Sequence, residues 1–133
     1  MEMTSAQLNI ETALAACRGD SALARALIAQ YRAGLPAERA KLADALAAAP
    51  PDWEAVRERA HRLQSGGAYL GAEQIALAAQ ELETGILAQN STATLMAAWQ
   101  TLERAFDEFS AAPIEDWEKR PGVVNRPSGG VVP

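Results

Sequence analysis

Apolar side chains recur three and four residues apart along most of this chain, and that spacing limits its fold more than any other feature. The most regular stripe consists of Leu95, Trp99, Leu102, Phe106 and Phe109. Side chains spaced in this way share one face of an α-helix, which must be buried against a neighbour. Before the tail, no β-branched run bounded by turn residues predicts a strand. The pattern therefore predicts an all-α protein.

Turn-forming and capping residues divide the pattern into five helical segments. The expected boundaries are Gly19, Asp20 or Ser21, Pro50, Pro51, Asp52, Gly71 and the run Asn90, Ser91 and Thr92. Before the last stripe, the expected core positions are Leu8, Ile10, Leu14, Cys17, Leu23, Leu27, Tyr31, Leu35, Leu42, Leu46, Val56, Ala60, Leu63, Gly67, Leu70, Ile75, Ala79, Leu82 and Ile86. Pro36 falls inside the second segment, where we expect a kink or a short break.

These segments predict an antiparallel four-helix bundle with an additional short N-terminal helix. A chain of 133 residues suits a single domain, which we place at residues 1–112. Residues 113–133 are rich in proline and glycine. They predict a tail or linker, whose first turn Ile114 and Trp117 could anchor on the bundle.

Composition excludes several functional classes. With 17 acidic and 12 basic residues and a net charge of −5, the chain is not expected to bind nucleic acid. Cys17 is the only cysteine, so it forms neither an internal disulfide nor a cysteine-based metal site. No apolar run approaches the roughly 18 residues of a membrane span, and the polar N-terminus is not a signal peptide. We expect a cytoplasmic protein that makes no membrane contact; its charge and lack of heptads favour a monomer.

Common catalytic motifs are missing from the sequence. No glycine-rich phosphate loop is followed by Lys and Ser or Thr, so we expect no ATP site of that type. Glu58 and His61 match the Glu-x-x-His pattern of di-iron bundles, but such sites need two motifs and His61 is the only histidine. We therefore expect no metal site, no bound cofactor and no catalytic triad.

His61 directly follows a core position, so it lies at the edge of the buried face. A lone histidine there is usually a bystander, but small residues surround this one. Ser65 and Ala68 lie along its helix face, and Gly66 and Gly67 occupy the next turn. Each glycine costs a helix about 1 kcal/mol relative to alanine, so something must come close to this pair. We expect Gly67 to serve helix packing, and Gly66 and Ser65 to leave clearance around the imidazole.

A turn at Gly71 and Ala72 would place Glu83 level with His61. The two residues lie equally far from Ala72, eleven positions before and eleven after it. A carboxylate there could accept the Nδ1–H of the imidazole, which fixes the tautomer and leaves Nε2 as an exposed nucleophile. Two alternatives stay open. Glu83 could be one more solvated acid, or Gln80, one turn earlier, could be the partner.

The residues from Ala60 to Ala72, together with Ile75, Leu82 and Glu83, resemble the signature of histidine-containing phosphotransfer (HPt) domains. Upstream, the pairs that also fit this family are Gly19-Asp20, Leu35-Pro36 and Asp52-Trp53. The resemblance covers about residues 8–110. It is closest to the HPt modules of hybrid sensor kinases.

The resemblance implies a phosphorelay intermediate. His61 would accept a phosphoryl group on Nε2 from a receiver-domain aspartate and pass it to another receiver domain. Glu83 would orient the ring, whereas Leu63, Gly71 and Leu82 would be structural. Mg²⁺ would belong to the receiver domain, and the chain would have no kinase activity of its own. The expected docking residues, besides Gln64 and Ser65 near the histidine, are Arg57, Arg62, Ala68, Gln80, Thr84 and Leu87.

The sequence departs from the family pattern at the position three residues after the histidine. The family usually has lysine there, followed by glycine; this chain has Gln64 and Ser65. Glutamine offers a hydrogen bond without a charge, so it stabilises a phosphoryl group less than lysine does. Arg57 and Arg62 could compensate in part. Two alternatives remain: a receiver-binding module of the same fold that carries no phosphate, and a plain helical bundle with a bystander histidine.

Overall fold

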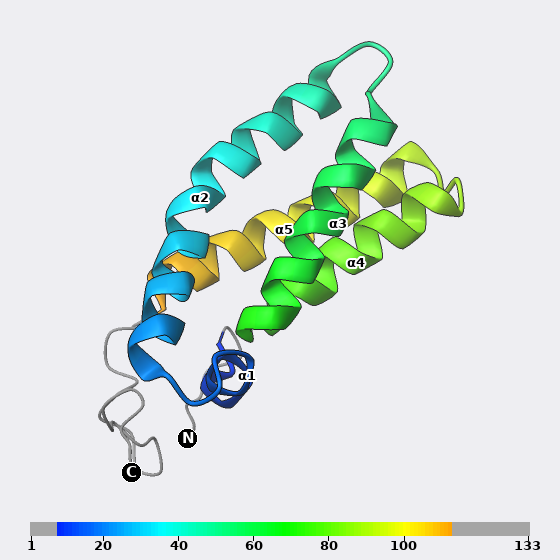
Figure 1. The fold of residues 1–133 in the computed structure, drawn as a ribbon. Helices are drawn as coiled ribbons and strands as arrows, with labels where there is room; N and C mark the ends of the chain where they lie inside the picture. Colours follow the sequence, from blue (N-terminus) through cyan, green and yellow to red (C-terminus); the bar gives the residue numbers. More distant parts are fainter. Residues whose placement is uncertain (1–7, 113–133) are drawn as a thin grey trace, which may run out of the picture.

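The computed structural model describes residues 8–112. Five helices make up most of this part of the chain: α1 (Ile10–Ala16), α2 (Ser21–Ala47), α3 (Trp53–Leu70), α4 (Glu73–Leu87) and α5 (Thr92–Ala111). Helices α2 to α5 run alternately up and down, and α1 lies across the end of the bundle where α3 turns into α4 (Figure 1). The all-α prediction is confirmed. Residues 1–7 and the predicted tail, including Ile114 and Trp117, lie outside the described residues.

Side-chain caps set the helix boundaries close to where the sequence predicts them. The carboxylates of Asp20 and Asp52 and the hydroxyl of Ser91 each accept a hydrogen bond from the backbone N–H three residues on. These bonds satisfy N–H groups that the first helical turn leaves unpaired. Gly71 ends α3 in the left-handed conformation, with φ +83°.

The second helix differs from the prediction in two respects. Leu23, expected in the core, is 45% exposed, and the buried face of the first turns instead carries Ser21, Ala24 and Ile28. Pro36 does not interrupt the helix, which continues to Ala47. Pro36 lies on the exposed face, where water can replace the hydrogen bond that its ring removes, while Leu35 is buried beside it. The expected break is therefore absent.

Hydrogen bonds from the segment before α1 stabilise the turn between α3 and α4. The backbone N–H of Asn9 donates to the carbonyl oxygen of Gly71 over 2.7 Å, and its side-chain amide donates to Glu73 over 2.9 Å. A Cβ atom on Gly71 would collide with the carbonyl oxygen of Asn9. Glycine is thus required at this turn both by its φ and by the close approach of Asn9, and the turn fixes the register of the two helices.

Candidate functional site

Helix α3 holds His61 beside its buried face. Ala60, directly before it, is fully buried, whereas the His61 side chain is 58% exposed. A step of one residue turns a side chain about 100° around the helix, so His61 leaves the core on the side that faces α4. The predicted position at the edge of the core is confirmed.

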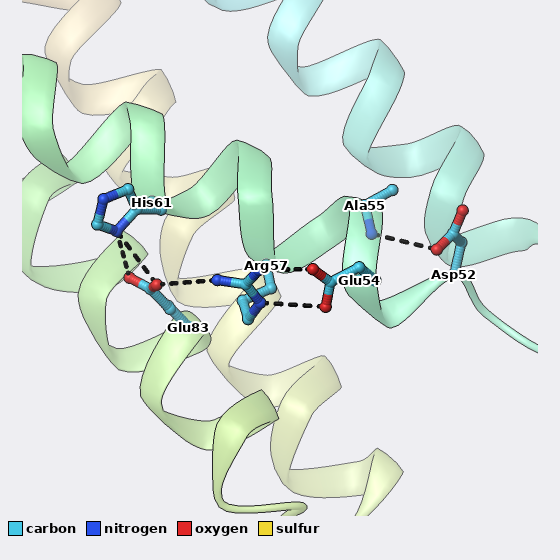
Figure 2. A network of polar contacts seen from close by, with 6 residues as sticks. All are labelled: Asp52, Glu54, Ala55, Arg57, His61 and Glu83. Carbon is cyan, nitrogen blue, oxygen red and sulfur yellow. Dashed lines mark hydrogen bonds and ion pairs between the residues drawn. The ribbon is translucent and has the colours of Figure 1, made fainter.

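The imidazole of His61 meets the carboxylate of Glu83 across the two helices (Figure 2). Both carboxylate oxygens lie 3.1 Å from Nδ1, and the Glu83 side chain is only 15% exposed. A carboxylate can only accept, so the contact is favourable when the proton is on Nδ1. Nε2 then carries the free lone pair, on the side of the ring that points away from Glu83.

A third side chain, that of Arg57, joins this pair from one turn earlier on α3. Its guanidinium forms a forked contact with Glu54 and lies 3.5 Å from Oε2 of Glu83. The hydrogen bond to Glu54 raises the pKa of Arg57 and lowers that of Glu54, and the charge of Glu83 adds to the shift on Arg57. The sequence predicts Arg57 as a docking residue that partly neutralises a phosphoryl group; in the structure, two carboxylates of its own chain contact its guanidinium.

Among residues 8–112, no cluster of His, Cys, Asp and Glu side chains could hold a metal ion. A comparison with protein families matches residues 26–112 to the Hpt domain. The matched range begins inside α2 and extends to the end of α5, so it includes the hairpin that carries His61 and Glu83.

The chain belongs to the Hpt domain family. Hpt domains act in the phosphotransfer reactions of two-component systems, where they interact with receiver domains, and this chain therefore has a phosphotransfer-type role of that kind. Searches of curated proteins and of solved structures returned no significant match. Within the described part of this Hpt chain, no helix combines the length and apolar character needed to cross a membrane.

The two glycines of α3 make room for neighbouring helices, not for the imidazole. A Cβ atom on Gly67 would lie 3.0 Å from the carbonyl oxygen of Ala72, so its predicted role in packing is confirmed. A Cβ atom on Gly66 would lie 3.0 Å from the ring of Tyr31, and no His61 atom is within 4 Å. The prediction that Gly66 clears space for His61 is wrong, because Gly66 lies about 140° around the helix from it and faces α2.

Tyr31 has a polar contact near this site that its place on the apolar stripe does not predict. Its side chain packs against the core, as predicted, and its hydroxyl donates to the carbonyl oxygen of Leu63 in α3 over 2.9 Å. Its ring packs edge-on against Phe109, and burial raises the pKa of the phenol. A tyrosine on an apolar stripe opposite a Gly-Gly pair could have signalled this contact, because a buried hydroxyl needs a partner.

The remaining predicted site residues lie around His61 on two helices. Gln64 is half-buried one turn after His61, and Ser65 and Ala68 are exposed on the same side of α3. On α4, Gln80 and Leu87 are exposed one turn before and after Glu83, and Leu87 is 64% exposed. Arg62 and Thr84 are also exposed, but each lies about 100° further around its helix than His61 or Glu83. The Hpt site is therefore surrounded by small and polar side chains, with one exposed leucine.

Proposed function

We propose that this Hpt domain is a phosphorelay intermediate. His61 accepts a phosphoryl group on Nε2 from the aspartyl phosphate of one receiver domain and passes it to the aspartate of another. The observation that carries this proposal is the contact between Nδ1 of His61 and both oxygens of Glu83, which leaves Nε2 exposed.

The transfer needs little from this chain beyond a correctly held imidazole. The lone pair of Nε2 attacks phosphorus in line, the bond between phosphorus and the aspartate oxygen breaks, and the aspartate leaves as a carboxylate. The phosphorylated ring keeps its Nδ1 proton and gains a positive charge, which the Glu83 carboxylate balances. The receiver domain supplies Mg²⁺, and attack by a second receiver's aspartate reverses the step. No ATP-dependent kinase activity is required of this chain.

The surface around the imidazole suits brief docking of a receiver domain. Small side chains leave Nε2 accessible, and the exposed Leu87 offers an apolar contact. Around these we assign to the docking surface Gln64, Ser65, Ala68, Gln80 and Leu87, with Arg62 and Thr84 at its margin. Such a surface is modest, as is typical of transient signalling complexes.

The test uses receiver domains charged with a small phosphodonor and Mg²⁺, each mixed with the wild-type chain or with His61→Gln. We expect acid-labile phosphate on the wild type only, and an unchanged fold in the variant by circular dichroism because His61 is exposed. Label retained by His61→Gln would overturn the proposal.

One observation favours a second candidate, a receiver-binding module that carries no phosphate. Gln64 occupies the position where the resemblance leads us to expect a lysine, and no positive charge replaces it there. Binding of a charged receiver domain without transfer of the phosphoryl group to the wild-type chain would favour this candidate.

A further inference from the structure

The contacts of Arg57 suggest a role within the site itself. Its guanidinium presents Nε and Nη2 to Glu54 and Nη1 to Glu83. The Arg57 and Glu83 side chains are 25% and 15% exposed, whereas Glu54 is 66% exposed. Of the two contacts of Arg57, the one with Glu83 is thus better shielded from solvent, and Glu83 is also the partner of His61. Glu54 contacts the arginine from the solvent side.

Glu83 therefore has two partners that share one oxygen. Oε2 lies 3.1 Å from Nδ1 of His61 and 3.5 Å from Nη1 of Arg57. A glutamate side chain with only the imidazole to hold it could rotate away into water, since it has three rotatable bonds. The second contact restricts that rotation.

We propose that Arg57 is a positioning residue: anchored by Glu54, it holds the Glu83 carboxylate against Nδ1 of His61 and so maintains the tautomer whose Nε2 is unprotonated. In a histidine side chain that is free in water the proton prefers Nε2, so this tautomer needs support from the protein. Partners one contact removed from a reactive group commonly orient it in this way. The consequence for phosphoryl transfer rests on the function proposed above; the tautomer itself does not.

The competing interpretation is that Arg57 forms only a surface ion pair with Glu54. Pairs three residues apart on a helix contribute little to stability and leave the neighbouring side chains unaffected. The two interpretations differ at His61, because only the positioning role makes the imidazole depend on Arg57.

The test is ¹⁵N NMR of the imidazole ring in the full chain, at alkaline pH. His61 is the only histidine, so the ring signals need no further assignment. In the wild type we expect a protonated Nδ1 and an unprotonated Nε2. Arg57→Gln should move both shifts toward the opposite tautomer, Glu54→Gln should move them less in the same direction, and Arg57→Lys should restore part of the wild-type signal.

Arg62→Gln is the matched control, because it removes the same charge one residue from His61 at an exposed position. Its ring shifts should equal those of the wild type. Unchanged shifts in Arg57→Gln, or equal changes in Arg57→Gln and Arg62→Gln, would overturn the positioning role. Backbone amide spectra establish that each variant is folded. Glu54→Gln tests the same series of contacts, from Glu54 through Arg57 and Glu83 to His61, at the residue that is most exposed.

A kinetic measurement links the tautomer to phosphoryl uptake. For a charged receiver domain that phosphorylates the wild type, Arg57→Gln should lower the maximal rate constant of phosphoryl transfer by about tenfold, while the receiver concentration that gives half of this rate stays the same. A raised half-saturating concentration with an unchanged maximal rate constant would instead make Arg57 a docking residue and overturn the proposal. If the wild type takes up no phosphate, the relay function fails while the NMR result still decides the role of Arg57.

Discussion

The two nitrogens of the His61 ring have different surroundings. Nδ1 faces a carboxylate that is largely buried, and Nε2 faces solvent. A neutral imidazole has one donor and one acceptor nitrogen. Because the Glu83 carboxylate is an acceptor held at Nδ1, Nδ1 is the donor and Nε2 is the acceptor with the free lone pair. The chain has a single histidine, and its described residues include no group that could hold a metal ion. The exposed, unprotonated Nε2 is therefore the atom at this site that can act as a nucleophile.

Gln64 should limit the lifetime of the phosphorylated form. It lies one turn after His61 on the same side of α3, where a lysine would place an ammonium near the phosphoryl oxygens. A charge-assisted hydrogen bond exceeds a neutral one by about 1 kcal/mol, so Gln64→Lys should lengthen the half-life of the phosphorylated chain about fivefold. The measurement is loss of label from the purified phosphorylated protein.

Gln100→Lys is the control for that experiment, since it adds the same charge at an exposed position of α5. Its half-life should match that of the wild type. Equal half-lives for the wild type and Gln64→Lys would show that residue 64 does not line the phosphorylated site.

The pairing of His61 with Glu83 could be predicted from the sequence, because a short turn at a glycine fixes which residues of two antiparallel helices are level. The contacts of Arg57 could not. Spacing places Arg57 on the same side as His61, but which of several nearby carboxylates a long side chain reaches depends on its rotamer and on the distance between the helices. The role of Gly66 was wrongly predicted for a related reason. Small residues indicate a close approach without showing which neighbour approaches.

At the scale of elements, the site depends on the hairpin of α3 and α4. Its turn is held by Gly71 and by the segment before α1, through the hydrogen bond from Asn9. A shift of this turn by one residue would carry Glu83 about 100° around α4, away from the imidazole.

Gly71→Ala should destabilise the protein by more than 2 kcal/mol. A left-handed backbone costs a residue with a Cβ roughly 1–2 kcal/mol, and the new atom would also collide with Asn9. Gly19→Ala separates these two effects, because Gly19 has φ +82° and nothing within 4 Å of the added Cβ. Urea unfolding should place Gly19→Ala between the wild type and Gly71→Ala. Equal losses in the two variants would mean that contact with Asn9 does not hold the turn.

Element boundaries were better predicted than the buried face of the longest helix. Caps act within three residues, so Asp20, Asp52 and Ser91 could be found locally. Helix α2 is rich in alanine, so the apolar stripe that begins at Leu23 and the adjacent stripe that includes Ala24 are nearly equally apolar. The choice between them depends on which side α1 and α3 cover, and that is decided by packing between distant segments.

At the scale of the whole molecule, the bundle is closed by contacts between its first and last long helices. Arg39 of α2 contacts both Glu103 and Asp107 of α5, and Arg32 donates to carbonyl oxygens of Ser110 and Ala112 at the end of α5. Arg32 satisfies carbonyl oxygens that the end of α5 leaves without a helical partner, whereas Arg39 forms ion pairs with two carboxylates on the side of α5. These contacts hold together two helices that are far apart in the sequence.

The Arg39–Asp107 contact should make stability depend on pH at the acidic end. The hydrogen bond from Arg39 lowers the pKa of Asp107 below its ordinary value of 3.8. A lowered pKa in the folded state stabilises the fold above the unfolded-state value, and this contribution is lost as the pH falls through the lower folded value. Asp107→Asn should therefore be less stable than the wild type at neutral pH, and this difference should shrink as the pH falls below 3.8.

The control is Asp44→Asn, which removes a carboxylate at an exposed position of α2. Thermal unfolding at neutral and acidic pH and at two salt concentrations gives the comparison. A difference between Asp107→Asn and the wild type that persists unchanged at acidic pH would show that the contact is not electrostatic. Raised salt should reduce the difference at neutral pH, because Asp107 is exposed.

The architecture was predictable from helical spacing and turn residues, and the family from the residues around His61. The boundary at residue 112, the tail, the cytoplasmic location, the monomeric state and the likeness to hybrid-kinase modules stay predictions. A partner's identity depends on contacts between two surfaces, of which this sequence specifies one.

The central claim is that His61 carries the phosphoryl group on Nε2 while Nδ1 donates to Glu83. The most direct measurement is combined ³¹P and ¹⁵N NMR of the full chain after transfer from a charged receiver domain. The chain's single histidine makes the signals unambiguous. We predict a phosphorus–nitrogen bond at Nε2 and a protonated Nδ1. A bond at Nδ1, or phosphate on any other residue, would contradict the account.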